Sequence, residues 1–287
     1  MPDLAITPLD DFAVLSVRGV DARSFLQGQL SNDIDLLDSR SSLVAGLHNA
    51  QGRCLALPRL LRVEPEHILL ALPADLAVPV ASQLSKFVFR ARIRIENASS
   101  QWRVYGAAGP DAEAAASTRL SIPMDVTGMR QMIVAPRLEA PPDGDIQSRA
   151  TWRLDDIAAG LPEIRAATSG LFTAQMLNLD LIGAVSFSKG CYTGQEIIAR
   201  AHYLGKVRRR MQRFWTADPQ ELPAGLRISL GDGRRAQIVM DSPGEGGGRE
   251  FLAVTTLGPQ VPQDDGEGAG ETCISVQQLA LPYPLSP

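Results

Sequence analysis

The chain has 287 residues, of which 45% are hydrophobic and 21% are charged. This balance is typical of a folded globular protein, and the length predicts two or three compact units rather than one. The formal net charge of -4 argues against tight, non-specific binding of RNA or DNA, which normally requires a basic surface. We therefore expect no stable nucleic-acid binding.

The chain has three cysteines, Cys54, Cys191 and Cys273. Their number is odd, their spacings are long and no CxxC motif occurs, so we expect no disulfide framework and a reducing, cytoplasmic setting. Three thiols are too few for the four-thiolate set of most iron–sulfur clusters. The three histidines show no metal-ligand spacing, and we expect no resident metal.

No secretory signal is visible at the N-terminus, which has neither a basic region nor an apolar run. The longest apolar stretch, 68–81, is interrupted by Pro73, Asp75 and Pro79. It is too short and too broken to span a bilayer, so we expect no membrane association.

The first half of the chain predicts short strands with helices between them. Strands are expected at 12–17, 68–72 and 90–96, the last with apolar and charged residues in strict alternation, and Asp21 is expected to cap a helix.

The middle of the chain continues this pattern. Strands are expected at 102–105 and 132–135, and a helix from about Thr151 should end with Gly160 as its C′ residue. Strand–helix–strand units of this kind predict α+β subdomains.

After Gly205 the pattern changes to strands separated by turns. The expected strands are 227–230, 236–240, 251–254 and 273–276. No long helical pattern occurs among them, which predicts a small β-barrel or sandwich.

The segment around Cys191 carries the chemistry that the sequence suggests most clearly. Thr193 and Glu196 fit a capping box, which would place Cys191 two residues before a helix. The positive end of that helix, together with Lys189, would favour a thiolate. The alternative is that Cys191 is a small buried apolar residue, as we expect for Cys54 and Cys273.

The helix after Cys191 should bury Ile197, Ala201 and Leu204 and stop at Gly205. A basic run follows, consisting of Lys206, Arg208, Arg209, Arg210 and Arg213. Two interpretations stay open for this run, the solvated face of a strand and a site for a phosphate or a carboxylate.

A family resemblance adds to this interpretation. The motifs that carry it are Gly160-Leu161-Pro162, Ala167-Thr168-Ser169-Gly170, Gln175, Asn178-Leu179, Ser186 to Glu196 with the core Lys-Gly-Cys-Tyr-x-Gly-Gln-Glu, and Leu281-Pro282-Tyr283. Together they resemble the YgfZ family, which is related to the T-protein, the aminomethyltransferase of the glycine cleavage system.

The resemblance implies an α+β fold in which two related subdomains form a ring and a C-terminal β-barrel follows. The expected ranges are about 1–45 with 150–205, then 46–149, and 206–287 for the barrel. It also implies a cofactor, tetrahydrofolate or a derivative, in the central opening. The implied role is to support the assembly or repair of iron–sulfur enzymes, including tRNA methylthiolation, with those enzymes or the assembly machinery as partners.

The resemblance also implies roles for individual residues. Cys191 would be the functional thiol, with Lys189 beside it. Phe12 and Trp152 would bind the folate, because flat pteridines stack on aromatic side chains. The motif residues expected to take part in cofactor binding are Tyr192, Gln195 and Glu196.

One departure from the related enzymes bears on the activity. Ala158 stands where the related enzymes carry a glutamate that pairs with the pteridine, and in this chain Asp155 or Asp156 would have to replace that glutamate. Asp75 falls in the region of their catalytic aspartate, but the motif around that aspartate is absent here. An active one-carbon (aminomethyl) transferase is therefore the alternative to an accessory factor. A cysteine hydrolase is a third possibility, but its only nearby base, His202, is poorly placed on the helix.

Overall fold

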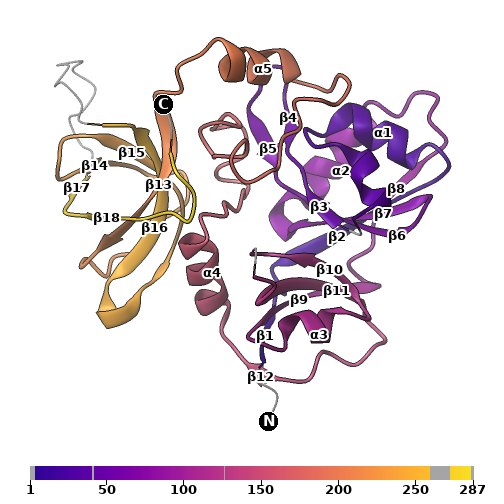
Figure 1. Cartoon of the computed structure of the whole chain (residues 1–287), viewed down its shortest axis with the longest axis horizontal. Coiled ribbons are helices and arrows are strands. Elements are labelled where there is room, and N and C mark those ends of the chain that lie inside the picture. The colour runs from indigo at the N-terminus through magenta and orange to yellow at the C-terminus, as the bar shows by residue number, and fades with distance from the viewer. Residues whose placement is uncertain (1–3, 41, 126, 259–271, 286–287) are drawn as a thin grey trace.

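The computed structural model describes residues 4–40, 42–125, 127–258 and 272–285 (Figure 1). They form three main sheets and one small hairpin, with short helices around them. In this part of the chain, no helix has the length and the apolar character that crossing a bilayer requires.

The first sheet has the strand order β3-β6-β7-β2-β8, with antiparallel neighbours wherever pairing is defined. Its strands are β2 (Phe12–Arg18), β3 (Ser42–Val44), β6 (Arg59–Glu64), β7 (His67–Pro73) and β8 (Arg94–Asn97). Successive side chains of a strand point to opposite faces. In β2, Leu15 and Val17 face one core cluster, whereas Phe12 and Val14 face another, so this sheet is buried on both sides.

The second sheet has the order β10-β11-β9-β1-β12. Its strands are β1 (Ala5–Pro8), β9 (Trp102–Ala108), β10 (Leu120–Pro123), β11 (Arg130–Pro136) and β12 (Asp145–Ile146). Val104, Met132 and Val134 meet the first sheet, while Ile133 and Ala135 point the other way.

The two sheets therefore pack face to face, and helices cover their outer faces (Figure 1). The helical elements on the first sheet are α1 (Ala22–Gln29), α2 (Ala77–Ser85), and the 3-10 turns η1 (Ile34–Asp38) and η2 (Ala74–Leu76). Helix α3 (Ala112–Ala116) lies on the second sheet. The result is two similar halves, each of mixed α/β structure, where a pair of α+β subdomains was expected.

These sheets divide the chain differently from the ranges expected for the subdomains. The first sheet combines residues 12–18 with 42–97, and the second combines 5–8 with 102–146. The boundary lies between β8 and β9, because β8 pairs in the first sheet and β9 in the second. Of the N-terminal strands, β1 belongs to the second sheet and β2 to the first. The assignment of folate-binding subdomains to the ranges 1–45 with 150–205 and 46–149 stays a prediction.

Helix α4 (Arg149–Ala158) runs between the two-sheet body and the C-terminal sheet (Figure 1). Ser148 caps it by accepting a hydrogen bond from the Thr151 amide, and Gly160 follows it with a φ of 64°, which confirms the expected end of this helix. The helix buries Trp152 completely. Gly106 of β9 makes room for the indole, since a Cβ at that position would overlap the ring.

The C-terminal part forms a curled, half-barrel sheet with the order β17-β14-β15-β16-β13-β18. Its elements are β13 (Arg209–Thr216), β14 (Arg227–Leu230), β15 (Arg235–Pro243), the turn η3 (Glu245–Gly247), β16 (Arg249–Thr256), β17 (Thr272–Ile274) and β18 (Gln277–Leu279). Only Ser275 and Val276 separate β17 at one edge from β18 at the other, so the chain draws the two edges together. Strands β14, β15 and β16 confirm three of the expected strands of this region, and β17 covers the fourth, 273–276, only as far as Ile274. Strand β18 begins beyond that expected range.

A small hairpin, β4 (Leu47–His48) and β5 (Cys54–Ala56), stands apart from the sheets and carries His48. The His48 side chain is fully buried, and neither ring nitrogen has a hydrogen-bond partner of normal geometry. Burial lowers the pKa of His48 from 6.5 to about 4, and the nearby Gly52 backbone, which acts to raise this pKa, offsets the effect of burial only partly.

We expect this histidine to make stability depend on pH. Above pH 6.5 both the folded and the unfolded state hold a neutral imidazole, and the stability is fully present. As the pH falls towards 4, only the unfolded state takes up the proton, so the free energy of unfolding should drop by about 2 kcal/mol between pH 6.5 and 5. Urea denaturation of wild type and His48→Leu across this range checks the prediction. An identical pH slope in both proteins would contradict it.

Candidate functional site

Cys191 is exposed and lies in the loop that leads into helix α5 (Gln195–Tyr203). The helix begins at Gln195 with Gly194 as its N-cap, and no side chain caps it. The expected capping box of Thr193 and Glu196 is therefore wrong, and the N-cap lies three residues after Cys191 rather than two. The helix end is correspondingly a weaker source of stabilisation for a thiolate, because its field falls off within one turn.

The reason for this helix start is a contact with the β4–β5 hairpin. Gly194 has a φ of 81°, and a Cβ there would overlap the Asn49 carbonyl oxygen. Glycine is the residue that tolerates both conditions. The hairpin also decides which face of α5 is covered, because Gly52 lies against Ile197 and Ile198.

The buried residue of α5 is Ile198, whereas Ile197 is 42% and Leu204 is 84% exposed. The expected buried face of Ile197, Ala201 and Leu204 is therefore wrong. His202 stacks on Phe187 with ring centroids 3.8 Å apart. Among the described residues no hydrogen bond joins Cys191 to a histidine, so a Cys–His pair for hydrolysis is not formed in this structure.

Lys189 does not lie free beside the thiol. Its Nζ donates to three carbonyl oxygens, those of Gln27 at 2.6 Å, Leu30 at 2.7 Å and Asn32 at 2.8 Å. These groups lie at the C-terminal end of α1, where helix carbonyls lack partners within the helix and favour a cation. Burial lowers the pKa of Lys189 to about 8. We expected Lys189 to supply a cation to the thiol. In the structure its ammonium group is bound to α1 instead, so Lys189 positions the Cys191 loop against that helix.

The other motif residues have mixed surroundings. The Tyr192 side chain is buried, its hydroxyl has no hydrogen-bond partner, and burial raises its pKa to about 12. Gln195 is half-buried and Glu196 is exposed in the first turn of α5. None of these three side chains lines the large cavity described below, so their part in cofactor binding stays a prediction.

Two further motif residues, Gln175 and Asn178, connect the irregular segment 161–194 to helix α5 and strand β13 through hydrogen bonds. Gln175 donates to the carbonyl of Ile198 at 2.7 Å, and Asn178 donates to that of Met211 at 2.9 Å. Asn178 has a φ of 58°, which asparagine tolerates better than most residues. These contacts replace the hydrogen bonds that a helix or a strand would provide.

The basic run after α5 is partly neutralised. Arg210 is buried and forms a two-pronged ion pair with Asp180, with both N–O distances 3.0 Å. Arg213 pairs with Glu250 at 2.6 Å. Both belong to β13, so these two residues fit the strand interpretation rather than an anion site, while Lys206 and Arg208 are exposed.

A cavity of about 740 Å³ lies where the end of α4 meets the first sheet, strand β10 and the C-terminal tail. Its lining residues are Arg40, Val44, Leu57, Arg59, Pro123, Met124, Asp125, Ala158, Ala159, Leu161, Pro162, Leu181, Ile182, Pro282 and Tyr283. The volume and the mostly apolar walls are those of a small-molecule site. Tyr283 is held there by donating to the Gly160 carbonyl at 2.7 Å, and burial raises its pKa to about 12.

Phe12 and Trp152 lie behind this wall rather than in it. Trp152 is fully buried and Phe12 nearly so, and both belong to the core between the two sheets. Direct stacking of both rings on a ligand is therefore not available in this structure. Phe12 instead supports Arg59, whose guanidinium carbon lies 5.8 Å from the ring centroid, and Arg130 lies over Trp152 at 4.2 Å.

The carboxylates expected near a pteridine are also placed elsewhere. Ala158 does line the cavity, but Asp155 and Asp156 turn towards Arg130, which lies 2.7 Å from Asp156. Asp75 accepts a hydrogen bond from the Ala166 amide outside the cavity. Among the lining residues the carboxylate is Asp125, and sequence reasoning did not single it out, nor Arg40 or Arg59. The signal for Arg59 was an arginine inside the apolar run 57–61.

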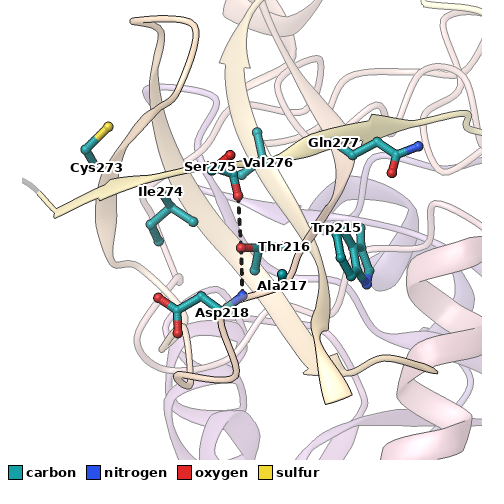
Figure 2. Close-up of a pocket in the computed structure, with 9 residues that line it drawn as sticks. All are labelled: Trp215, Thr216, Ala217, Asp218, Cys273, Ile274, Ser275, Val276 and Gln277. Atoms are coloured by element: carbon teal, nitrogen blue, oxygen red, sulfur yellow. Dashed lines mark hydrogen bonds between the residues drawn. The ribbon is translucent and has the colours of Figure 1, made fainter. Parts of the chain in front are cut away.

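A second, smaller pocket of about 370 Å³ lies where the edges of the half-barrel approach each other (Figure 2). Thr216 joins the two sides by donating to the Ser275 carbonyl at 2.9 Å and accepting from the Asp218 amide. Cys273 is exposed here, contrary to the expectation of a structural thiol, because β17 is an edge strand. Cys54 is fully buried and burial raises its pKa to about 12, which agrees with a structural role. Within the described residues no cluster of histidine, cysteine and carboxylate side chains could hold a metal ion.

Comparison with solved structures defines the class of fold. The glycine cleavage system aminomethyltransferase T from Bartonella henselae superposes with a TM-score of 0.67, over 88% of this chain and 78% of that one, at 17% sequence identity. The mixed α/β body with its curled C-terminal sheet is thus an aminomethyltransferase-like fold.

Sequence comparison is more specific. A comparison with models of known protein families finds no match. The tRNA-modifying protein YgfZ of Edwardsiella ictaluri is 31% identical over 290 residues, covering 91% of this chain and 86% of that protein, and the one of Colwellia psychrerythraea is 30% identical over 234 residues, covering 74% and 71%. The chain belongs to the YgfZ family of tRNA-modifying proteins.

Proposed function

We propose that this chain is an accessory protein that binds tetrahydrofolate or a derivative in the 740 Å³ cavity and supports the assembly or repair of iron–sulfur enzymes, including those of tRNA methylthiolation. Cys191 is its functional thiol. The observation that carries the proposal is the convergence of separate motif segments, Leu161-Pro162 and Pro282-Tyr283, on one cavity in an aminomethyltransferase-like fold.

The cavity and the thiol belong to one continuous segment. Leu161, Pro162, Leu181 and Ile182 line the cavity, and the same irregular stretch continues to Cys191. This stretch has few of the backbone hydrogen bonds that a helix or a sheet would provide. A ligand packed against it would therefore favour one arrangement of the Cys191 loop over others. This supports a folate-dependent role for the thiol.

The alternative, aminomethyl transfer, requires a carboxylate placed against the reacting part of the folate. Ala158 and Ala159 form the wall where a carboxylate is expected, and Asp125 already accepts two hydrogen bonds from Thr127. We therefore favour the accessory role. Production of methylene-tetrahydrofolate from the glycine-cleavage carrier protein, well above a blank, would favour the transferase instead.

We expect calorimetry with tetrahydrofolate or folinate to give saturable binding, and Ala158→Phe to weaken it at least about 10-fold, because the added ring occupies the cavity. Ala114→Phe is the matched control, since Ala114 is an exposed alanine of α3 and is not one of the lining residues. This variant should bind the folate with the same affinity as wild type. The absence of binding at millimolar ligand would remove folate from the proposal.

A further inference from the structure

Arg59 is the most unusual charged group of the cavity. It stands on β6, its exposure is 4%, and it lines the cavity. Among the described residues no ion pair or side-chain hydrogen bond to Arg59 is formed, and its Nε is buried without a partner. Buried charges are normally paired, because removing an ion from water costs several kcal/mol.

The surroundings of Arg59 do not compensate its charge. It is accompanied by four other guanidiniums and four carboxylates, Arg130, Arg149, Arg153, Arg165, Asp11, Asp155, Asp156 and Glu163. Each of these carboxylates already faces one of the other arginines: Arg130 lies 2.7 Å from Asp156, and Arg149 lies 2.5 Å from Glu163. One positive charge is left over, and it belongs to the arginine on the cavity wall.

The contact with Phe12 does not remove this excess. The guanidinium carbon lies 5.8 Å from the ring centroid, a distance at which a cation–π interaction compensates only part of the desolvation. Burial accordingly lowers the pKa of Arg59, with the more distant Asp156 and Glu163 acting in the opposite direction. A ligand that supplies a negative charge would complete the network.

We propose that Arg59 is the anion-recognising residue of the cavity and binds an ionised carboxylate of its ligand. The inference deepens the proposed function and rests on it for the identity of the ligand. A tetrahydrofolate pteridine is uncharged at neutral pH, so the contact falls to the glutamate part of the molecule. Arg40, an exposed residue of the lining, provides a second cation of the cavity.

The test compares three probes on wild type and Arg59→Met by calorimetry. Tetrahydrofolate carries both parts, p-aminobenzoylglutamate has the carboxylates without the pteridine, and tetrahydropterin has the pteridine without carboxylates. We expect Arg59→Met to weaken the first two by about 10- to 100-fold, the range of a hydrogen-bonded ionic contact, and to change tetrahydropterin binding less than about 2-fold. Arg62→Met is the matched control, because Arg62 lies on the same strand and pairs with Asp38 instead.

The melting temperature of the unliganded protein separates recognition from a structural role. Replacing an unpaired buried cation by an apolar side chain should leave the melting temperature unchanged or raise it, whereas loss of a structural contact would lower the melting temperature. If Arg59→Met fails to fold, Arg59 is structural and the inference is wrong. A second measurement on wild type needs no variant: p-aminobenzoylglutamate, which carries the carboxylates without the pteridine, should raise its melting temperature at constant ionic strength. The absence of any rise at saturating concentration would contradict carboxylate recognition.

The outcomes also separate this inference from the proposed function. If tetrahydrofolate binds wild type and Arg59→Met equally, the folate site stands and the role of Arg59 is wrong. If only p-aminobenzoylglutamate binds, and only with Arg59 present, the anion site stands and folate is the wrong ligand. Equal weakening of all three probes would overturn carboxylate recognition.

Discussion

Lys189→Met is expected to lower the free energy of unfolding by about 3 kcal/mol, because three carbonyl oxygens lose their shared donor. The ammonium uses all three of its hydrogens on Gln27, Leu30 and Asn32, and methionine fills similar space without replacing any of them. Urea denaturation measures the change. The loop that Lys189 anchors should also become more mobile, so hydrogen exchange of residues 190–193 should speed up in the variant.

Lys86→Met is the matched control for this prediction. Lys86 is an exposed lysine whose Nζ donates only to the Gln83 side chain at 3.1 Å. Its replacement should change the free energy of unfolding by less than about 0.5 kcal/mol. Equal effects of the two variants would show that Lys189 does not anchor the loop.

Cys191→Ser is expected to reduce the support of tRNA methylthiolation more than about 10-fold in a bacterial strain that lacks its own YgfZ protein. Serine keeps the shape of the side chain but not the nucleophilic, metal-binding thiolate chemistry. Since Cys191 is exposed, the substitution should leave stability within about 0.5 kcal/mol of wild type, and the loss can be assigned to the thiol. Mass spectrometry of the tRNA nucleosides measures the effect.

Cys273→Ser is the control for this variant, because Cys273 is also exposed but lies on the edge strand β17. It should support methylthiolation as wild type does. If Cys191→Ser also restores it, the Lys-Gly-Cys segment marks only a structural turn, and the function rests with the cavity alone.

Local patterns predicted the elements that depend on local chemistry. The helix that ends before Gly160 and the strands β14, β15 and β16 of the C-terminal sheet follow from capping residues, turns and periodicity. The alternating residues of 90–96 were expected as one strand, but β8 covers only Arg94–Asn97, where it pairs with β2.

Contacts between distant parts of the chain explain the errors. Thr193 and Glu196 fit a capping box, yet the approach of Gly194 to Asn49 moved the start of α5. Sequence could identify Phe12 and Trp152 as large aromatic residues but not the layer in which they lie. The excess charge of Arg59 becomes visible only when its neighbours from four different segments are placed around it.

The proposed function is tested most directly by the amount of methylthiolated nucleoside in tRNA from a strain that lacks YgfZ and produces this chain. Wild type should restore the modification, Ala114→Phe should do the same, and Ala158→Phe, with its cavity filled, should restore little of it at equal protein level. Full restoration by Ala158→Phe would contradict a role for the cavity. Failure of the well-expressed wild-type chain to restore any modification would contradict the proposed function itself.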